Sequence, residues 1–117
     1  MRVLIVEDDE PTSLALEEVL ELEGYAVRAV RNGADAIDAL HSFTADVLLV
    51  DLQLPVMDGR SFIELYRRRG PAARIVVLSG RTDGRAIAQS IGGVTYLAKP
   101  FEATDLLAAI SEAVAVA

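Results

Sequence analysis

The sequence contains no cysteine among its 117 residues. Disulfides and thiolate metal sites are therefore excluded, which fits a reducing compartment. No apolar run approaches the length of a membrane span. The N-terminus turns acidic directly after Val6 and has no cleavage site, unlike a signal peptide. These absences favour a protein that works without a membrane.

An excess of basic residues is also missing, because the formal net charge is −7. This balance argues against direct nucleic acid binding by the domain. The length suits one domain with a real core, and 52% hydrophobic and 25% charged residues are typical of a globular protein. With no repeat or internal linker, we expect one domain spanning residues 1–117.

The stretch Asp46–Asp51 has four consecutive apolar residues that lead straight into Asp51. A short run without polar alternation is typical of a strand buried on both faces of a parallel sheet. A carboxylate at the end of such a strand is costly unless a cation neutralises it. The sequence therefore raises the question of which cation Asp51 meets.

Strands alternate with helices five times along the chain. Further strands are expected at residues 2–6, 25–30, 74–78 and 94–98, and helices are expected to start near Pro11, Asn32, Asp58, Gly84 and after Phe101. This order predicts an α/β fold, with a doubly wound five-stranded parallel sheet flanked by five helices. In such sheets, ligands bind beyond the carboxyl ends of the strands.

Polar residues follow four of the five predicted strands: Glu7-Asp8, Asp51, Ser79 and Lys99. Carboxylates that converge at one sheet edge repel one another unless a cation binds. Because the chain lacks cysteine, a hard, oxygen-liking ion such as Mg²⁺ is the natural candidate. A carboxylate can also form an aspartyl phosphate, which Lys99 and Ser79 would contact.

The chain resembles the receiver domain of two-component response regulators over essentially its whole length. The matching segments each lie at a strand end: Val6–Asp9, Val50–Pro55, Met57–Gly59, Val77–Gly80 and Tyr96–Phe101. Each segment alone is a weak signal, whereas all five in order are highly specific. The resemblance implies a flavodoxin-like sheet with strand order 2-1-3-4-5.

The resemblance implies that Asp51 accepts a phosphoryl group from a phosphohistidine. It assigns Mg²⁺ to Asp8 directly, to Glu7 through water, to Asp51, and to the backbone carbonyl of Gln53. Ser79 and Lys99 would contact the phosphoryl oxygens, and the Lys99-Pro100 bond would be cis. Ser79 and Tyr96 would form the switch that shifts the population of the last helix–strand–helix surface between two states.

The implied partner is a sensor histidine kinase or a histidine phosphotransfer protein, and an output domain or a second copy is possible downstream. The implied setting is bacterial and cytoplasmic, with no membrane contact. Such a switch is not an enzyme, because it catalyses only its own phosphorylation and dephosphorylation. His41, the single histidine, is expected in the middle of a helix, so the chain resembles an acceptor of phosphoryl groups.

Two departures from the family pattern stand out. Gly80 replaces the commoner alanine, which suggests wider access to the site, and the segment from Ser79 to Gly92 is slightly short. Asp9 and Glu10 are expected to serve the N-terminus of a helix.

Other functions stay open at this point. A metal-dependent phosphatase would want a second acid where Gln53 stands, and a flavin or nucleotide carrier would want a glycine-rich loop where Glu7–Glu10 lies. A degenerate receiver that acts only as a protein-interaction module is the remaining alternative.

Overall fold

The computed structural model describes residues 1–70 and 73–115. Its strands are β1 (Arg2–Val6), β2 (Ala26–Val30), β3 (Val47–Asp51), β4 (Arg74–Ser79) and β5 (Thr95–Ala98). Its helices are α1 (Glu10–Leu22), α2 (Gly33–Ala39), α3 (Gly59–Arg68), α4 (Gly84–Ile91) and α5 (Ala103–Ala115). In the part of the chain described, no helix combines the length and the apolar character needed to cross a membrane.

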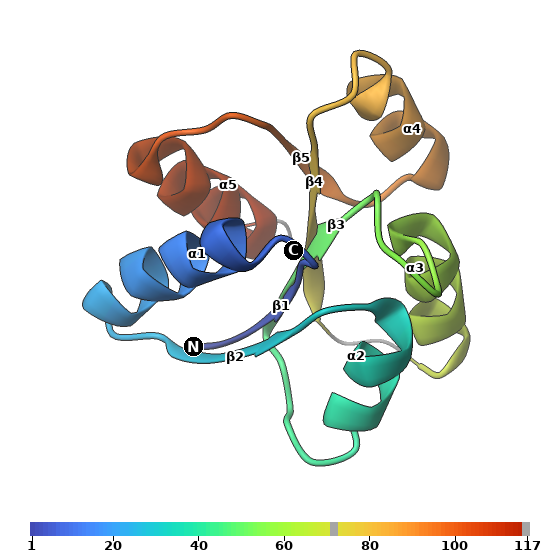
Figure 1. Cartoon of the computed structure of the whole chain (residues 1–117), viewed down its shortest axis with the longest axis horizontal. Helices are drawn as coiled ribbons and strands as arrows, with labels where there is room; N and C mark the ends of the chain where they lie inside the picture. Colours follow the sequence, from blue (N-terminus) through green and yellow to red (C-terminus); the bar gives the residue numbers. More distant parts are fainter. Residues whose placement is uncertain (71–72, 116–117) are drawn as a thin grey trace.

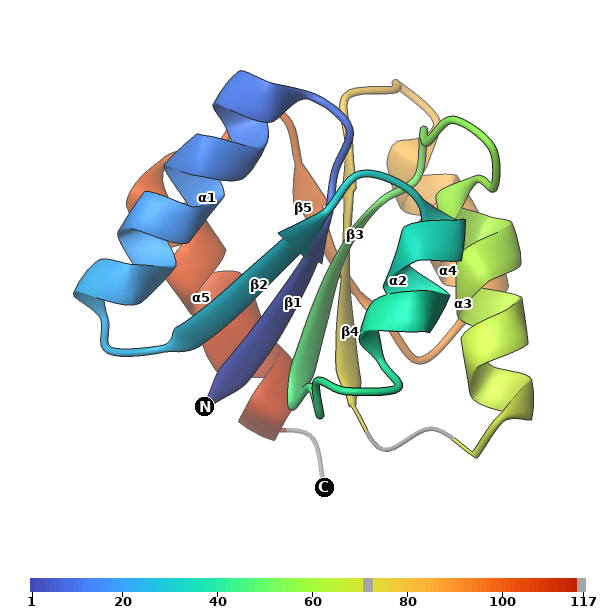
Figure 2. The ribbon, with the colours of Figure 1, turned by 60° about the horizontal axis from the view of Figure 1, so that its bottom comes forward.

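All neighbouring strands are parallel, in the order β2-β1-β3-β4-β5, so the predicted fold is confirmed. In the register, Val6 lies beside Val50 and Asp51 beside Leu78. The loops that follow β1, β3 and β4 therefore rise from one edge of the sheet, which is the upper edge in Figure 2.

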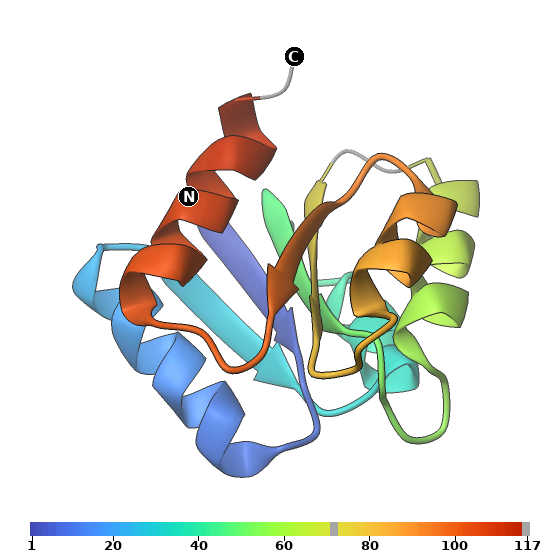
Figure 3. The same ribbon diagram turned by 90° about the horizontal axis from the view of Figure 1, so that it is seen from above.

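Two helical layers cover the sheet. Helices α1 and α5 lie on one face, and α2, α3 and α4 lie on the other (Figures 1 and 3). Side chains of a strand point alternately to the two faces, so Val47 and Leu49 pack toward α1 and α5, whereas Leu48 and Val50 pack toward the other layer. All of β3 is buried, as its apolar run predicts.

Side-chain caps fix the starts of three helices. Asp9, Asn32 and Asp58 each accept a hydrogen bond from the backbone amide three residues further on, at the N-termini of α1, α2 and α3. Asp83 precedes α4 without such a bond. The position of the first turn of α4 therefore depends on packing.

Helix α3 holds the far end of α4 through arginine side chains. The Arg67 guanidinium donates to the carbonyl oxygens of Ile91 and Gly93, at 3.4 and 3.2 Å. Arg60 donates to the Ser90 hydroxyl at 2.7 Å. Arg67 therefore satisfies carbonyl groups that the end of a helix leaves without intrahelical partners.

The expected place of His41 was wrong. Helix α2 ends at Ala39, and His41 is exposed in the turn that follows. The amides of His41 and Ser42 donate to the carbonyls of Asp38 and Ala39, three residues back, so α2 ends in a tightened turn. Phe43, after this turn, is buried in the core on the α2 side of the sheet.

Candidate functional site

Three carboxylates gather at the carboxyl edge of the sheet. Glu7 and Asp8 follow β1, and Asp51 ends the neighbouring strand β3, so the sheet register brings them together. Their ligand oxygens lie within 4.8 Å of one another. Glu7 and Asp51 are 1% and 4% exposed, whereas Asp8 faces solvent. Two of the three acids are therefore removed from water.

Lys99 is the cation that meets these buried acids. Its ammonium nitrogen lies 2.6 Å from Oε1 of Glu7 and 2.6 Å from Oδ2 of Asp51. The other Asp51 oxygen, Oδ1, accepts the backbone amide of Gln53 at 2.8 Å. Lys99 thus offsets the charge that makes a buried strand-end carboxylate costly.

Burial shifts the titration of this group. Desolvation, together with the neighbouring Asp51 carboxylate, raises the pKa of Glu7 from 4.5 to about 7. Desolvation also opposes the charge on Lys99, but its hydrogen bonds to Asp51 and Glu7 outweigh that effect and raise its pKa. The cluster therefore holds a charged lysine beside a glutamate that titrates near neutral pH.

The end of β5 places Lys99 at this edge. The Lys99 amide donates to the Ser79 carbonyl at 2.9 Å, which continues the pairing of β4 with β5. The peptide bond from Lys99 to Pro100 is cis, as the resemblance implies. The pairing of β4 with β5 places the Lys99 side chain at the end of β4, within reach of Asp51 at the end of β3.

Ser79 and Tyr96 lie next to each other on β4 and β5. Ser79 is 1% exposed, and its Oγ accepts the Arg81 amide at 3.1 Å. The Tyr96 hydroxyl donates to the Ser79 carbonyl oxygen at 3.4 Å. The serine hydroxyl is thus held in the β4–α4 connection, and the tyrosine ring points toward it.

Gly59 allows the first turn of α3 to lie directly against the end of β3. A Cβ atom at Gly59 would collide with the carbonyl oxygen of Asp51 and would lie 2.8 Å from Cα of Leu52. The first turn of α3 can therefore approach the end of β3 only because residue 59 has no side chain.

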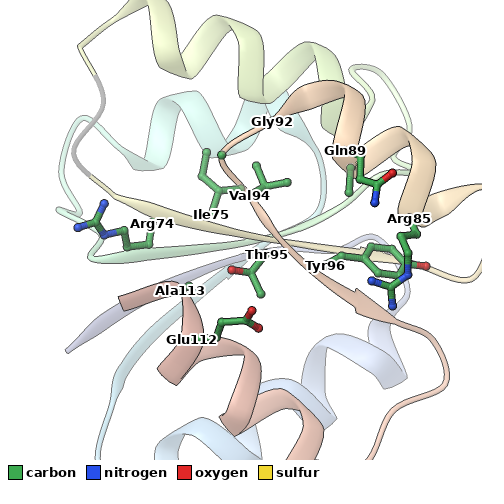
Figure 4. A pocket seen from close by; sticks show the side chains of 12 residues that line it. Arg74, Ile75, Arg85, Gln89, Gly92, Val94, Thr95, Tyr96, Glu112 and Ala113 are labelled. Carbon is green, nitrogen blue, oxygen red and sulfur yellow. The ribbon is translucent and has the colours of Figure 1, made fainter. Parts of the chain in front are cut away.

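A separate pocket of about 530 Å³ lies between α4 and α5, across β5 (Figure 4). Arg85, Thr95, Tyr96 and Glu112 are among its lining residues. Figure 4 shows the Arg85 side chain beside the Tyr96 ring, and the guanidinium carbon lies 5.0 Å from the ring centroid. Tyr96 therefore connects this pocket with Ser79, and no sequence pattern pointed to Arg85.

The donor set of the acidic cluster fits a hard divalent cation. Every ligand atom is a carboxylate oxygen, and two of the carboxylates are buried. Mg²⁺ favours one or two carboxylates together with water and phosphate oxygens, and exposed Asp8 leaves one side open to them. The arrangement therefore suits an ion that meets a phosphoryl group at the rim of the sheet.

Comparison with solved structures points to one family. A response regulator from Chloroflexus aurantiacus superposes with a TM-score of 0.90 and 30% identity, over 97% of both chains. The receiver domain of the sensor histidine kinase PA1611 from Pseudomonas aeruginosa superposes with a TM-score of 0.87 and 28% identity, over 97% of both chains. That receiver domain has a magnesium ion coordinated in its active-site cleft.

Curated relatives agree with this result. The transcriptional regulator NtrC of Escherichia coli is 32% identical over 96% of this chain, and the response regulator MprA of Mycobacterium avium is 34% identical over 92%. The chain spans about a quarter of NtrC and about half of MprA. Residues 3–111 match the family described as the response regulator receiver domain, and the chain therefore belongs to that family.

Proposed function

We propose that this domain is a phosphoacceptor switch in which Asp51 receives a phosphoryl group from a phosphohistidine in the presence of Mg²⁺. The observation that carries the proposal is the buried Asp51 carboxylate, which lies 2.6 Å from the Lys99 ammonium inside an all-carboxylate cluster. Family membership and the magnesium ion in the related PA1611 receiver domain support it.

The proposed transfer needs one nucleophile and charge neutralisation. An oxygen of Asp51 forms a bond to phosphorus while the phosphorus–nitrogen bond of the donor breaks, and the electron pair returns to the imidazole nitrogen, which takes a proton from water. A bound magnesium ion would supply positive charge beside the transferred oxygens. Glu7, Asp8, Asp51 and the carbonyl of Gln53 are the groups proposed to hold it.

Lys99 and Ser79 are proposed to take over the phosphoryl oxygens. Lys99 already bonds to Asp51, so it can follow the new negative charge with a small movement. The Ser79 hydroxyl would leave the Arg81 amide to reach the phosphoryl group. The Tyr96 ring would then move into the space that the hydroxyl leaves. This movement would change the α4–β5–α5 surface on phosphorylation.

The proposed donor is a histidine kinase or a histidine phosphotransfer protein, and the proposed output is a change of partner. The domain would catalyse no reaction on other substrates. An output domain or a second copy would read the switch, since the curated relatives are longer proteins and NtrC is described as DNA-binding. The net charge of −7 disfavours nucleic acid as a direct partner of this domain.

Intact-protein mass after incubation with acetyl phosphate and Mg²⁺ tests the proposal. We expect a gain of one phosphoryl group that disappears without metal and in Asp51→Asn. Asp38→Asn is the matched control, because Asp38 is an exposed aspartate on α2. Magnesium binding is measured separately by titration calorimetry.

Two results together would contradict the proposal. If the wild type gains no mass from acetyl phosphate or from a phosphorylated donor, and also binds no Mg²⁺, the domain is a receiver that acts only through protein contacts. A mass gain that persists in Asp51→Asn would instead move the acceptor to another residue.

A further inference from the structure

The first turn of α4 packs directly against Ser79 and Tyr96. Only the four residues Gly80–Asp83 connect β4 to α4. A Cβ atom at Gly84 would lie 2.7 Å from the Tyr96 hydroxyl and 2.8 Å from Oγ of Ser79. Gly84 is therefore in close contact with both of these side chains, and any larger residue would have to push one of them away.

Arg85, the next residue, covers the Tyr96 ring from outside. Its guanidinium carbon lies 5.0 Å from the ring centroid, within the range of a cation–π contact. The Tyr96 hydroxyl points the other way, to the Ser79 carbonyl. Arg85 thus contacts the ring, whereas Gly84 and Ser79 lie at its hydroxyl end.

Among the residues described, no side chain caps the N-terminus of α4 by a hydrogen bond. Asp83 occupies the N-cap position of α4 but bonds to the Arg81 guanidinium at 2.7 Å and makes no cap hydrogen bond. The far end of α4 is held by Arg67. The contact of Gly84 and Arg85 with Tyr96 therefore helps to set the distance between the N-terminus of α4 and the serine hydroxyl, together with the hydrogen bond from the Gly84 amide to the Arg81 carbonyl.

We propose that Gly84 and Arg85 are positioning residues that hold the Tyr96 ring against Ser79 and so make the first turn of α4 part of the switch. The inference rests on the proposed function. When the Ser79 hydroxyl turns toward a phosphoryl group on Asp51, the ring can follow it inward and stay beneath Arg85. Arg85 contacts the ring in the position where the Tyr96 hydroxyl reaches Ser79, so this contact stabilises the inward state.

Thermodynamic linkage gives the size of the effect. A group that favours the inward ring also favours a phosphoryl mimic at Asp51, and by the same factor. A cation–π contact at an exposed site contributes a factor of about two to five in such an equilibrium. Loss of Arg85 should therefore weaken the binding of beryllofluoride with Mg²⁺ by about two- to fivefold.

The test uses four variants in α4, the Tyr96→Leu variant and two readouts, all on the full chain. Arg85→Ala removes the contact, and Arg85→Lys restores a cation. Gly84→Ala introduces the colliding methyl group, and Gln89→Ala is the control, one turn further along α4 in the same pocket. The first readout is the NMR chemical shifts of the residue 85 side chain and of the Tyr96 ring in the unphosphorylated protein. The second is the affinity for beryllofluoride in the presence of Mg²⁺.

We expect upfield-shifted Arg85 δ-protons in the wild type, a shift that Tyr96→Leu abolishes. Arg85→Ala and Gly84→Ala should move the Tyr96 ring signals and weaken beryllofluoride binding, Arg85→Lys should recover part of the affinity, and Gln89→Ala should change neither readout.

Two outcomes would overturn the positioning role. One is the absence of a ring-current shift at Arg85 in the wild type, and the other is an Arg85→Ala affinity equal to that of Gln89→Ala. Failure of the proposed function looks different, because the wild type itself would then bind no beryllofluoride while the ring-current shift at Arg85 persists.

Discussion

The Lys99 ammonium nitrogen lies 2.6 Å from Oδ2 of Asp51, although the two residues are 48 positions apart in the chain. The same nitrogen lies 2.6 Å from Glu7, so one cation serves two buried acids. Lys99 is the only lysine in the sequence. Selective lysine labelling should therefore report this one side-chain ammonium directly.

Lys99→Met should destabilise the domain by about 3 kcal/mol, because it leaves two buried acids without their cation. Chemical denaturation measures the loss, and Arg69→Met, which removes an exposed cation, serves as the control. Added Mg²⁺ should recover more stability in Lys99→Met than in the wild type, since the ion then enters a site with excess negative charge. Equal magnesium effects in both proteins would argue against a metal site at these carboxylates.

Glu7 should make stability depend on pH near neutrality. Its pKa in the folded domain, about 7, lies above the ordinary value of 4.5, so the folded state binds more protons between these two values. The stabilisation from Glu7 is complete below about pH 4.5 and is lost as the pH rises through 7. The wild type should therefore lose stability relative to Glu7→Gln between pH 5 and pH 8. Glu18→Gln, at an exposed acid, should show no such trend relative to the wild type.

Two glycine-to-alanine variants should differ in stability. Gly59→Ala should cost about 1–3 kcal/mol, because its methyl group collides with the backbone of Asp51 and Leu52. Gly80→Ala should be tolerated, since its Cβ would lie 3.7 Å from Cβ of Lys99, an ordinary contact. Thermal unfolding of both variants provides the comparison. A Gly59→Ala protein as stable as Gly80→Ala would show that α3 does not need this close approach.

Val56 should be a strained position. It has φ = +69° in a tight turn, in which the Met57 amide donates to the Pro55 carbonyl at 2.7 Å, and its side chain is 86% exposed. A β-branched residue is unfavourable there, so Val56→Gly should stabilise the domain by about 1 kcal/mol. Val56→Ala removes the two exposed methyl groups but keeps the Cβ atom and most of the backbone strain, so it should gain less. If Val56→Gly were less stable than Val56→Ala, the backbone at residue 56 would not be strained.

The fold could be predicted because its signals are local. Each buried strand is a short apolar run, and Asp9, Asn32 and Asp58 are effective caps. The meeting of Asp51 with the residues after β1 also follows, since parallel strands end at one edge.

Contacts between distant side chains could not be predicted in the same way. The sequence raised the question of a cation for Asp51, but only the folded chain shows Lys99 between two acids. Arg85 on Tyr96 and Arg67 on the end of α4 depend on the packing angles of helices, which no local pattern encodes. His41 was misplaced because α2 ends at Ala39 in a tightened turn that no local sequence pattern marks.

The contact of Lys99 with Glu7 and Asp51 has a consequence for how the domain would bind the proposed magnesium ion. In the resting state the acidic site already carries a counter-ion of its own, together with a proton that Glu7 exchanges near neutral pH. Under the proposed function, magnesium would load by ion exchange, because the incoming divalent ion would compete with a tethered ammonium and with hydrogen ions. The Lys99 ammonium is tethered and cannot diffuse away. Magnesium binding would therefore be readily reversible, and the carboxylates would return to the lysine each time the ion leaves.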